Sequence, residues 1–303
     1  MTQSTLFQAC PLLPSVEDAL RTHYKIVSAP SEEVVAAITS SRFGVTREQM
    51  DAMPALRAIV HFGVGYETTD VAYARSRGVV VSNTPDVLTD CVADLAVGGL
   101  IDVLRRLSAA ERFVRRGDWQ SGQFPLAVKV TGKRVGILGL GRIGRAIAHR
   151  LTAFDARLSY HSRHRVADVP YTYAASPEAL AAGADVLVVA TSGGPETAGL
   201  VSAPVLAALG PAGYLVNIAR GSVVDEPALV EAITNGTIAG AALDVFADEP
   251  NVPPALLDLD NVVLLPHIAS ATTETREAMG ELAFRNLHQF MTDGTLVTPV
   301  DIR

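Results

Sequence analysis

The stretch VGILGLGRIG, residues 135–144, decides the fold of this chain. A short apolar run leads into the pattern Gly-x-Gly-x-x-Gly, and a helical pattern follows it. In such a strand–loop–helix unit the first glycine permits a tight turn, the second lets a pyrophosphate approach the backbone, and the third lets helix and strand pack closely. The stretch therefore predicts a dinucleotide site made by Gly139, Leu140, Gly141, Arg142, Ile143 and Gly144. By itself the pattern is weak, and an ordinary glycine turn is the alternative.

Strand-like and helix-like segments alternate on both sides of this loop, which predicts α/β architecture with parallel sheets. From the loop onward, strands are expected at 134–138, 156–161, 185–190, 213–218, 238–243 and 262–265. Before it, strands are expected at 24–27, 34–38, 56–62 and 79–81, and helices at 46–53 and 69–77. The fold prediction is two doubly wound parallel-sheet domains of the Rossmann or flavodoxin type, with a cleft between them.

Several helix ends can be placed from local signals. Ser176 and Asp225 are expected to cap helices, and a last helix is expected at about 272–291. A long helical pattern runs from about 89 to 115 and contains the pair Gly98-Gly99, which is unusual inside a helix. This pair indicates either a bend where two domains meet or tight helix packing, and the sequence does not decide between them.

Composition limits the class of protein. A length of 303 residues favours two domains, and 49% hydrophobic with 19% charged residues is typical of a packed globular protein. The net charge of −7 argues against nucleic acid as a partner, and Cys10 and Cys91 have no metal-type spacing. The chain has no apolar run near the roughly 20 residues that cross a bilayer, and its N-terminus does not resemble a signal peptide. We expect a cytoplasmic protein with no metal and no membrane partner.

The second strand of the dinucleotide unit indicates which cofactor is used. An NAD site is expected to place an acid about 20 residues after the glycines. Here the strand ends in His161, and Ser162-Arg163 follow it without an acid. A hydroxyl and a guanidinium suit a 2′-phosphate, so NADPH is favoured, with NADH as a weaker possibility. A solvated basic turn is the alternative.

Three side chains that can carry acid–base chemistry follow successive expected strands. They are Arg220, Glu249 and His267. Ligands of an open parallel sheet bind beyond the carboxyl ends of its strands, so these residues are expected on one rim. Arg220 could bind a substrate carboxylate, and His267, oriented by Glu249, could exchange a proton. Each alone is more often structural; their joint placement after a nucleotide loop favours catalysis. Ile218 and Asp244, at the ends of two of these strands, are expected to contact the cofactor.

From about Leu56 to Thr275 the chain resembles the D-2-hydroxyacid dehydrogenase family. The matching stretches are GVGYETTD (63–70), GILGLGRIGRAIA (136–148), VNIARGSVVDEPALVEA (216–232), GAALDVFADEP (240–250) and LLPHIASAT (264–272). The resemblance implies a substrate arginine at Arg220, a catalytic pair at Glu249 and His267, and a nicotinamide contact at Asp244. It also implies that the backbone of Val64 and Gly65 binds the substrate carboxylate.

The resemblance further implies a substrate-binding domain of residues 1–98 and 273–303, a dinucleotide-binding domain of residues 99–272, and a homodimer. Within the family, Ser162-Arg163 and the short C-terminus resemble NADPH-dependent glyoxylate and hydroxypyruvate reductases. The expected reaction is therefore reduction of a small 2-oxo acid to the 2-hydroxy acid. The alternatives are a short phosphoglycerate or D-lactate dehydrogenase and a non-enzymatic dinucleotide sensor. Trp119 and Phe124 lie in a loop that either reaches a partner subunit or only covers the surface.

Overall fold

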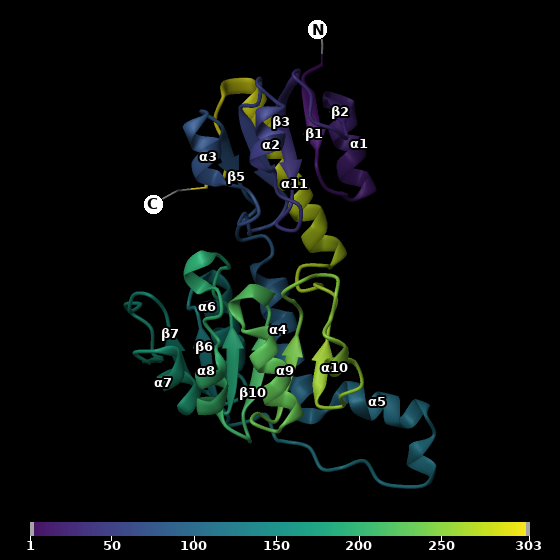
Figure 1. Cartoon of the computed structure of the whole chain (residues 1–303), viewed down its shortest axis with the longest axis vertical. Helices are drawn as coiled ribbons and strands as arrows, with labels where there is room; N and C mark the ends of the chain where they lie inside the picture. Colours follow the sequence, from purple (N-terminus) through teal and green to yellow (C-terminus); the bar gives the residue numbers. More distant parts are fainter. Residues whose placement is uncertain (1–2, 301–303) are drawn as a thin grey trace. The chain divides into compact units, whose positions relative to one another are not determined.

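The computed structural model describes residues 3–300, which form two compact units (Figure 1). One unit comprises residues 3–88 and 270–300, and the other comprises residues 89–269. Each has its own parallel sheet. The two parallel-sheet α/β units confirm the predicted fold class, and the cleft between them stays a prediction.

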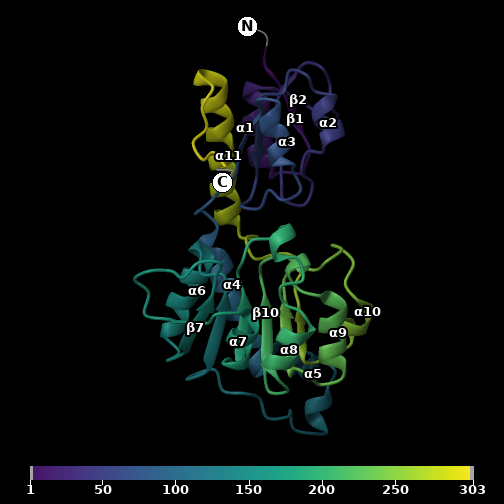
Figure 2. The ribbon, with the colours of Figure 1, turned by 60° about the vertical axis from the view of Figure 1, so that its left-hand side comes forward.

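The first unit has a five-stranded sheet in the order β2-β1-β3-β4-β5, which is the flavodoxin-like order. Helix α11 packs against α1 and β4 in this unit, although it comes from the far end of the chain (Figure 2). The elements are β1 (Thr5–Gln8), α1 (Pro14–His23), β2 (Lys25–Val27), β3 (Val34–Thr39), α2 (Arg47–Asp51), β4 (Ala58–His61), α3 (Val71–Ser76), β5 (Val80–Ser82) and α11 (Thr273–Asp293).

The second unit has a seven-stranded parallel sheet in the order β12-β11-β10-β9-β6-β7-β8. Its strands are β6 (Arg134–Leu138), β7 (Arg157–His161), β8 (Thr172–Tyr173), β9 (Val186–Val189), β10 (Tyr214–Asn217), β11 (Gly240–Leu243) and β12 (Val262–Leu264). The strand order reverses between β6 and β9, and in this class of sheet ligands bind beyond the strand ends at such a point.

Helices cover both faces of the second sheet. They are α4 (Thr89–Arg105), α5 (Leu107–Arg115), α6 (Arg142–Thr152), α7 (Pro177–Ala182), α8 (Ala203–Leu209), α9 (Glu226–Thr234) and α10 (Pro254–Leu257), with short 3₁₀ turns η1 (Asp118–Gln120), η2 (Pro195–Thr197) and η3 (Gly221–Val223). As predicted, the side chains of Ser176 and Asp225 cap α7 and α9 by accepting backbone N–H groups.

The long helix expected from 89 to 115 is two helices. The break falls at Arg106, whose φ of 55° is left-handed, and not at Gly98-Gly99. A methyl group on Gly99 would lie 3.3 Å from the Cβ atom of Ala242 in β11, so this glycine permits tight packing of α4 on the sheet. Because all of α4 packs within the second unit, the units divide at 88/89 and 269/270, whereas the sequence placed the divisions at 98/99 and 272/273.

Within residues 3–300, no helix combines the length and apolar character needed to cross a membrane. Cys10 and Cys91, both in this described part of the chain, are not joined by a disulfide.

Candidate active site

The glycine loop joins β6 to α6 at the point where the strand order reverses. Gly139 has a φ of 98°, and a methyl group on it would lie 2.7 Å from backbone atoms of Thr191. A methyl group on Gly144 would lie 2.0 Å from the carbonyl oxygen of Gly139. Gly141, at the start of α6, faces open space: nothing lies within 4 Å of its added Cβ. The loop therefore leaves the helix N-terminus uncovered, which fits a pyrophosphate.

The turn after β7 borders the same loop. The backbone N–H of Leu140 donates to Ser162 Oγ at 3.0 Å, and that of Gly139 donates to the His161 carbonyl at 2.8 Å. The His161 ring stacks on Tyr173, and its Nδ1 lies 2.9 Å from the Ala174 carbonyl oxygen. Ser162 is therefore held beside the loop, while the ring of His161 contacts the β8 side of the sheet.

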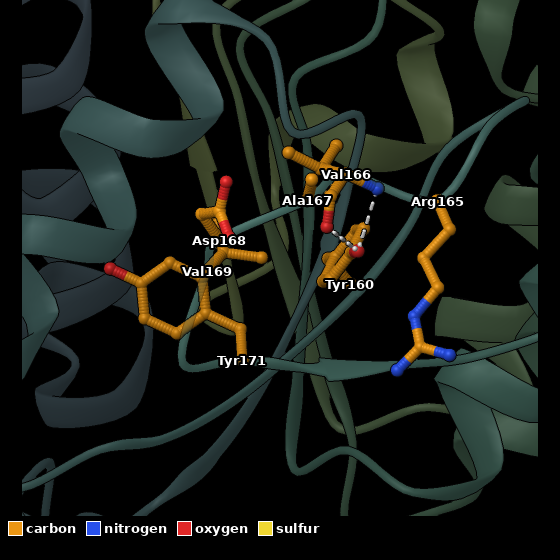
Figure 3. Close-up of a pocket in the computed structure, with 7 residues that line it drawn as sticks. All are labelled: Tyr160, Arg165, Val166, Ala167, Asp168, Val169 and Tyr171. Atoms are coloured by element: carbon orange, nitrogen blue, oxygen red, sulfur yellow. Dashed lines mark hydrogen bonds between the residues drawn. The ribbon is translucent and has the colours of Figure 1, made fainter.

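A buried tyrosine fixes the conformation of this turn. The Tyr160 hydroxyl accepts the Val166 N–H at 2.9 Å and donates to the Val166 carbonyl at 3.1 Å (Figure 3). The chain between them, which contains Ser162 and Arg163, is folded back as a closed turn. Sequence reasoning missed this role of Tyr160. A cavity of about 260 Å³ lies beside the turn, and neither the glycine loop nor Arg220, Glu249 or His267 lines it.

The structure joins two of the expected catalytic residues directly. His267 Nδ1 lies 2.7 Å from Glu249 Oε2, and Glu249 Oε1 accepts the Phe246 N–H at 3.2 Å. Burial raises the pKa of Glu249, but the hydrogen bond and charge of His267, with the charge of Arg220, lower it below its ordinary value. His267 has a φ of 55°, which is uncommon for a side chain of this size. With Nδ1 engaged, Nε2 is the nitrogen that can exchange a proton with a substrate.

Asp244 holds the turn that carries His267. Its two carboxylate oxygens accept the N–H groups of Ile268 at 2.7 Å and Ala269 at 2.9 Å, and its side chain is buried. Burial raises the pKa of Asp244, although these two hydrogen bonds oppose that effect. The sequence pointed to a nicotinamide contact at Asp244, which stays a prediction. It did not reveal this positioning role, because the bonded residues lie 24 and 25 positions away.

Arg220 follows β10, and contacts restrain both its backbone and the aliphatic part of its side chain. Asn217 donates its amide to the Arg220 carbonyl at 3.0 Å, and a methyl group on Gly193 would lie 2.7 Å from Arg220 Cγ. The positive charge of Arg220 contributes to the lowering of the pKa of Glu249. Ile218 directly follows β10 and is buried, and its N–H donates to the carbonyl of Val189, the last residue of β9, at 3.4 Å.

Val64 and Gly65 lie in the first unit, in the loop after β4, and both are half-buried. Asn83 donates its amide to the Val64 carbonyl at 2.8 Å. His61, just before the loop, is buried, and burial lowers its pKa to about 4. It is therefore neutral near pH 7. Arg57 is exposed and precedes β4, so it stands at the opposite end of the strand.

Across residues 3–300, no cluster of three or more His, Cys, Asp or Glu side chains is placed to hold a metal ion. At the expected site the structure places an imidazole–carboxylate pair, a guanidinium and a glycine loop. Each of these groups lies at the carboxyl edge of the seven-stranded sheet, because each follows the end of one of its strands.

Comparison with known proteins identifies the class. Residues 97–269 match the family model "D-isomer specific 2-hydroxyacid dehydrogenase, NAD binding domain". Hydroxyphenylpyruvate reductase of Plectranthus scutellarioides is 45% identical in an alignment 303 positions long, which covers 96% of this chain and 97% of that protein. Glyoxylate/hydroxypyruvate reductase A of Arabidopsis thaliana is 42% identical in an alignment 303 positions long, which covers 96% of this chain and 97% of that protein.

Comparison with solved structures points to the same family. An NADPH-dependent glyoxylate/hydroxypyruvate reductase of Sinorhizobium meliloti, crystallised with NADP and malonate, superposes with a TM-score of 0.94 at 44% identity. The match covers 99% of this chain and 97% of that one. The chain belongs to the D-isomer specific 2-hydroxyacid dehydrogenase family, as the resemblance in its sequence implied. It is an NAD(P)-dependent oxidoreductase.

Proposed function

We propose that the protein reduces a small 2-oxo acid, glyoxylate or hydroxypyruvate, to the 2-hydroxy acid with NADPH. The observation that carries the proposal is the His267–Glu249 pair at 2.7 Å, on the same sheet edge as a glycine loop with an open helix N-terminus. Relatives whose names give this reaction, and a structural neighbour bound to NADP, support it.

NADPH supplies a hydride when it is bound, and this chain's residues hold it in place. The glycine loop offers backbone N–H groups to the pyrophosphate. Ser162 and Arg163 offer a hydroxyl and a guanidinium to the 2′-phosphate. Ile218, Asp244 and His161 are further proposed contacts, and Asp244 would act with its carboxylate already bonded to Ile268 and Ala269.

The remaining groups act on the substrate. Arg220 would bind the carboxylate with two parallel hydrogen bonds and polarise the adjacent oxo group. The N–H groups of Val64 and Gly65 are proposed as further donors to that carboxylate. His267 would deliver a proton from Nε2 to the developing alkoxide, while Glu249 stabilises the protonated ring. The product has the D configuration wherever the carbon is stereogenic.

The phosphoglycerate alternative requires cations near the Val64 loop to bind a phosphate. His61 cannot supply one near pH 7, because burial lowers its pKa to about 4. Arg57 stands at the far end of its strand. Arg276 of α11 is a further cation near this loop, since its guanidinium lies over the Phe62 ring at 5.7 Å from the centroid. Phosphohydroxypyruvate is therefore included in the substrate panel.

Steady-state assays with a panel of 2-oxo acids test the proposal. We expect glyoxylate or hydroxypyruvate to oxidise NADPH with a higher kcat/KM than pyruvate or phosphohydroxypyruvate. Hydroxyphenylpyruvate belongs in the panel because a relative is named for it. Each acid is assayed with NADPH and NADH. A clear preference for NADH would contradict the role given to Ser162 and Arg163, and no turnover with any acid would favour a dinucleotide sensor.

We further propose a cytoplasmic homodimer that forms through the second unit. Large apolar side chains are exposed on α5 and the segment after it; they are Leu107 (48%), Val114 (54%), Trp119 (68%) and Leu126 (101%). A dimer interface would bury them. Phe124 instead contacts Phe113 and Arg106 of its own chain, so Trp119 is the better candidate to reach a partner.

Sedimentation of variants, which measures the oligomeric state, tests whether these side chains form the interface. Trp119→Ala combined with Leu126→Asp is expected to shift the protein from dimer to monomer at micromolar concentration, because it removes apolar contact area and adds a buried charge. Phe43→Asp is the matched control, since Phe43 is 48% exposed and lies in the first unit. A double variant that sediments as the wild type does would place the interface elsewhere.

A further inference from the structure

We propose that Glu196 is a specificity-determining residue for the cofactor. Its carboxylate forms an ion pair with the Arg163 guanidinium, and the 2′-phosphate of the cofactor must replace this carboxylate to bind Arg163. The proposal rests on NADPH being the cofactor. It concerns a contact of this chain with itself, since Arg163 Nη1 lies 2.8 Å from Glu196 Oε2.

The ion pair joins the two loops that flank the glycine loop. In the sheet β6 lies between β7 and β9; Arg163 follows β7, and Glu196 lies in η2, which follows β9. The glycine loop contacts both neighbours, because Leu140 bonds Ser162 and Gly139 packs against Thr191. The Arg163–Glu196 pair therefore connects the two sides of the crevice where the adenosine half of a dinucleotide is expected.

Both side chains are free to exchange partners, while their backbones are fixed. Arg163 and Glu196 are 78% and 76% exposed, so their pair is screened by water and opens at small cost. The Tyr160–Val166 bonds close the turn that carries Arg163. On the other side the Thr197 hydroxyl donates to the Ser192 carbonyl at 2.8 Å, which fixes η2. Only rotations of the two side chains are needed to exchange carboxylate for phosphate.

This exchange distinguishes the two cofactors. A carboxylate and a phosphate both accept the forked N–H donors of arginine, so they compete for the same groups. NADPH brings a 2′-phosphate that replaces Glu196. NADH brings no such group, so Arg163 stays with Glu196. Removing the carboxylate should therefore strengthen binding of 2′-phosphorylated ligands selectively.

A rival explanation is long-range charge, since removal of any nearby acid would favour an anionic ligand. Glu178 provides the matched control for it. Glu178 is also exposed and lies in the first turn of α7, where a hydrogen bond with Ser176 and the charge of His161 help to lower its pKa, and its carboxyl does not bond Arg163. Glu178→Gln removes the same charge from the same side of the sheet without freeing Arg163.

The experiment is calorimetric titration of the full-length protein with 2′,5′-ADP, 5′-AMP, NADPH and NADH, in the absence of a 2-oxo acid. In Glu196→Gln we expect the Kd for 2′,5′-ADP and NADPH to fall by about two- to fivefold, the range of an exposed ion pair. The Kd for 5′-AMP and NADH should not change. Glu178→Gln should match the wild type, and Glu196→Gln should have no effect in an Arg163→Ala background. The gain should also shrink at high salt.

Three results would overturn the proposal. Equal tightening of 5′-AMP and 2′,5′-ADP would assign the effect to long-range charge. Unchanged or weaker 2′,5′-ADP binding in Glu196→Gln would show that Glu196 does not compete for Arg163. A wild-type protein that binds 5′-AMP as tightly as 2′,5′-ADP would refute the cofactor assignment itself, and the role of Glu196 with it.

Discussion

Replacing His267 with alanine is expected to lower kcat by about 10³-fold, which lies within the range attributed to a positioned general acid. The Kd for NADPH should stay within about twofold of the wild type, because the glycine loop and Arg163 are untouched. Stopped-flow or steady-state kinetics give kcat, and fluorescence titration gives the Kd. His149→Ala is the matched control, since His149 is an exposed histidine on α6.

Glu249→Gln separates proton transfer from a merely structural role of the pair. Glu249 has a lowered pKa, so its carboxylate is ionised near pH 7 and is protonated only at lower pH. The glutamine amide that replaces it has no proton to gain in this range. The acid limb of kcat/KM that protonation of Glu249 causes should therefore disappear, and kcat should fall less than in His267→Ala. Full turnover in His267→Ala would remove this histidine from the mechanism.

Much of the second unit could be predicted because its strands are buried on both faces. Strands of that kind appear as continuous apolar runs between turn residues. β6 occurs at the expected residues 134–138, and the expected runs at 213–218 and 238–243 contain β10 and β11 with one or two residues trimmed at their ends. The residues outside the two observed strands directly flank them. The predicted order of the loops along the sheet edge therefore agrees with the observed strand order.

The elements that were missed depend on contacts distant in sequence. β8 has only two residues, and its pairing with β7 defines it. β1 is a four-residue strand whose place between β2 and β3 comes from the sheet. The break at Arg106 carries no glycine or proline signal; its guanidinium lies over the Phe124 ring, at 5.2 Å from the centroid. Local pattern cannot reveal a conformation that such contacts select.

The candidate active site shows the same division. The residue types at Arg220, Glu249 and His267 pointed to the chemistry, and the chain order of the strands placed them on one edge. The couplings between loops were not visible, because Asp244 bonds backbone 24 residues away and Arg163 pairs with a side chain 33 residues away. Sequence patterns identify which groups can react, whereas folding determines which groups hold them in position.

Gly221→Ala is expected to destabilise the protein by at least about 3 kcal/mol and to abolish most activity. A methyl group on Gly221 would lie 1.9 Å from the carbonyl carbon of Phe246, 2.1 Å from its oxygen and 2.3 Å from Ala247 N. These are backbone atoms and cannot rotate away. Gly221 follows Arg220, and the Phe246 N–H bonds Glu249, so the clash would push the loop that carries Arg220 away from the His267–Glu249 pair.

Urea unfolding and kcat/KM for the 2-oxo acid measure both effects. Gly98→Ala is the matched control, because Gly98 is exposed on α4 of the same unit and nothing lies within 4 Å of its added Cβ. It should unfold at the urea concentration of the wild type, or slightly above it, since alanine reduces the freedom of the unfolded chain. If Gly221→Ala were folded, stable and fully active, the loop after β10 would not be packed on the chain after β11, and the approach of Arg220 to Glu249 would have to be abandoned.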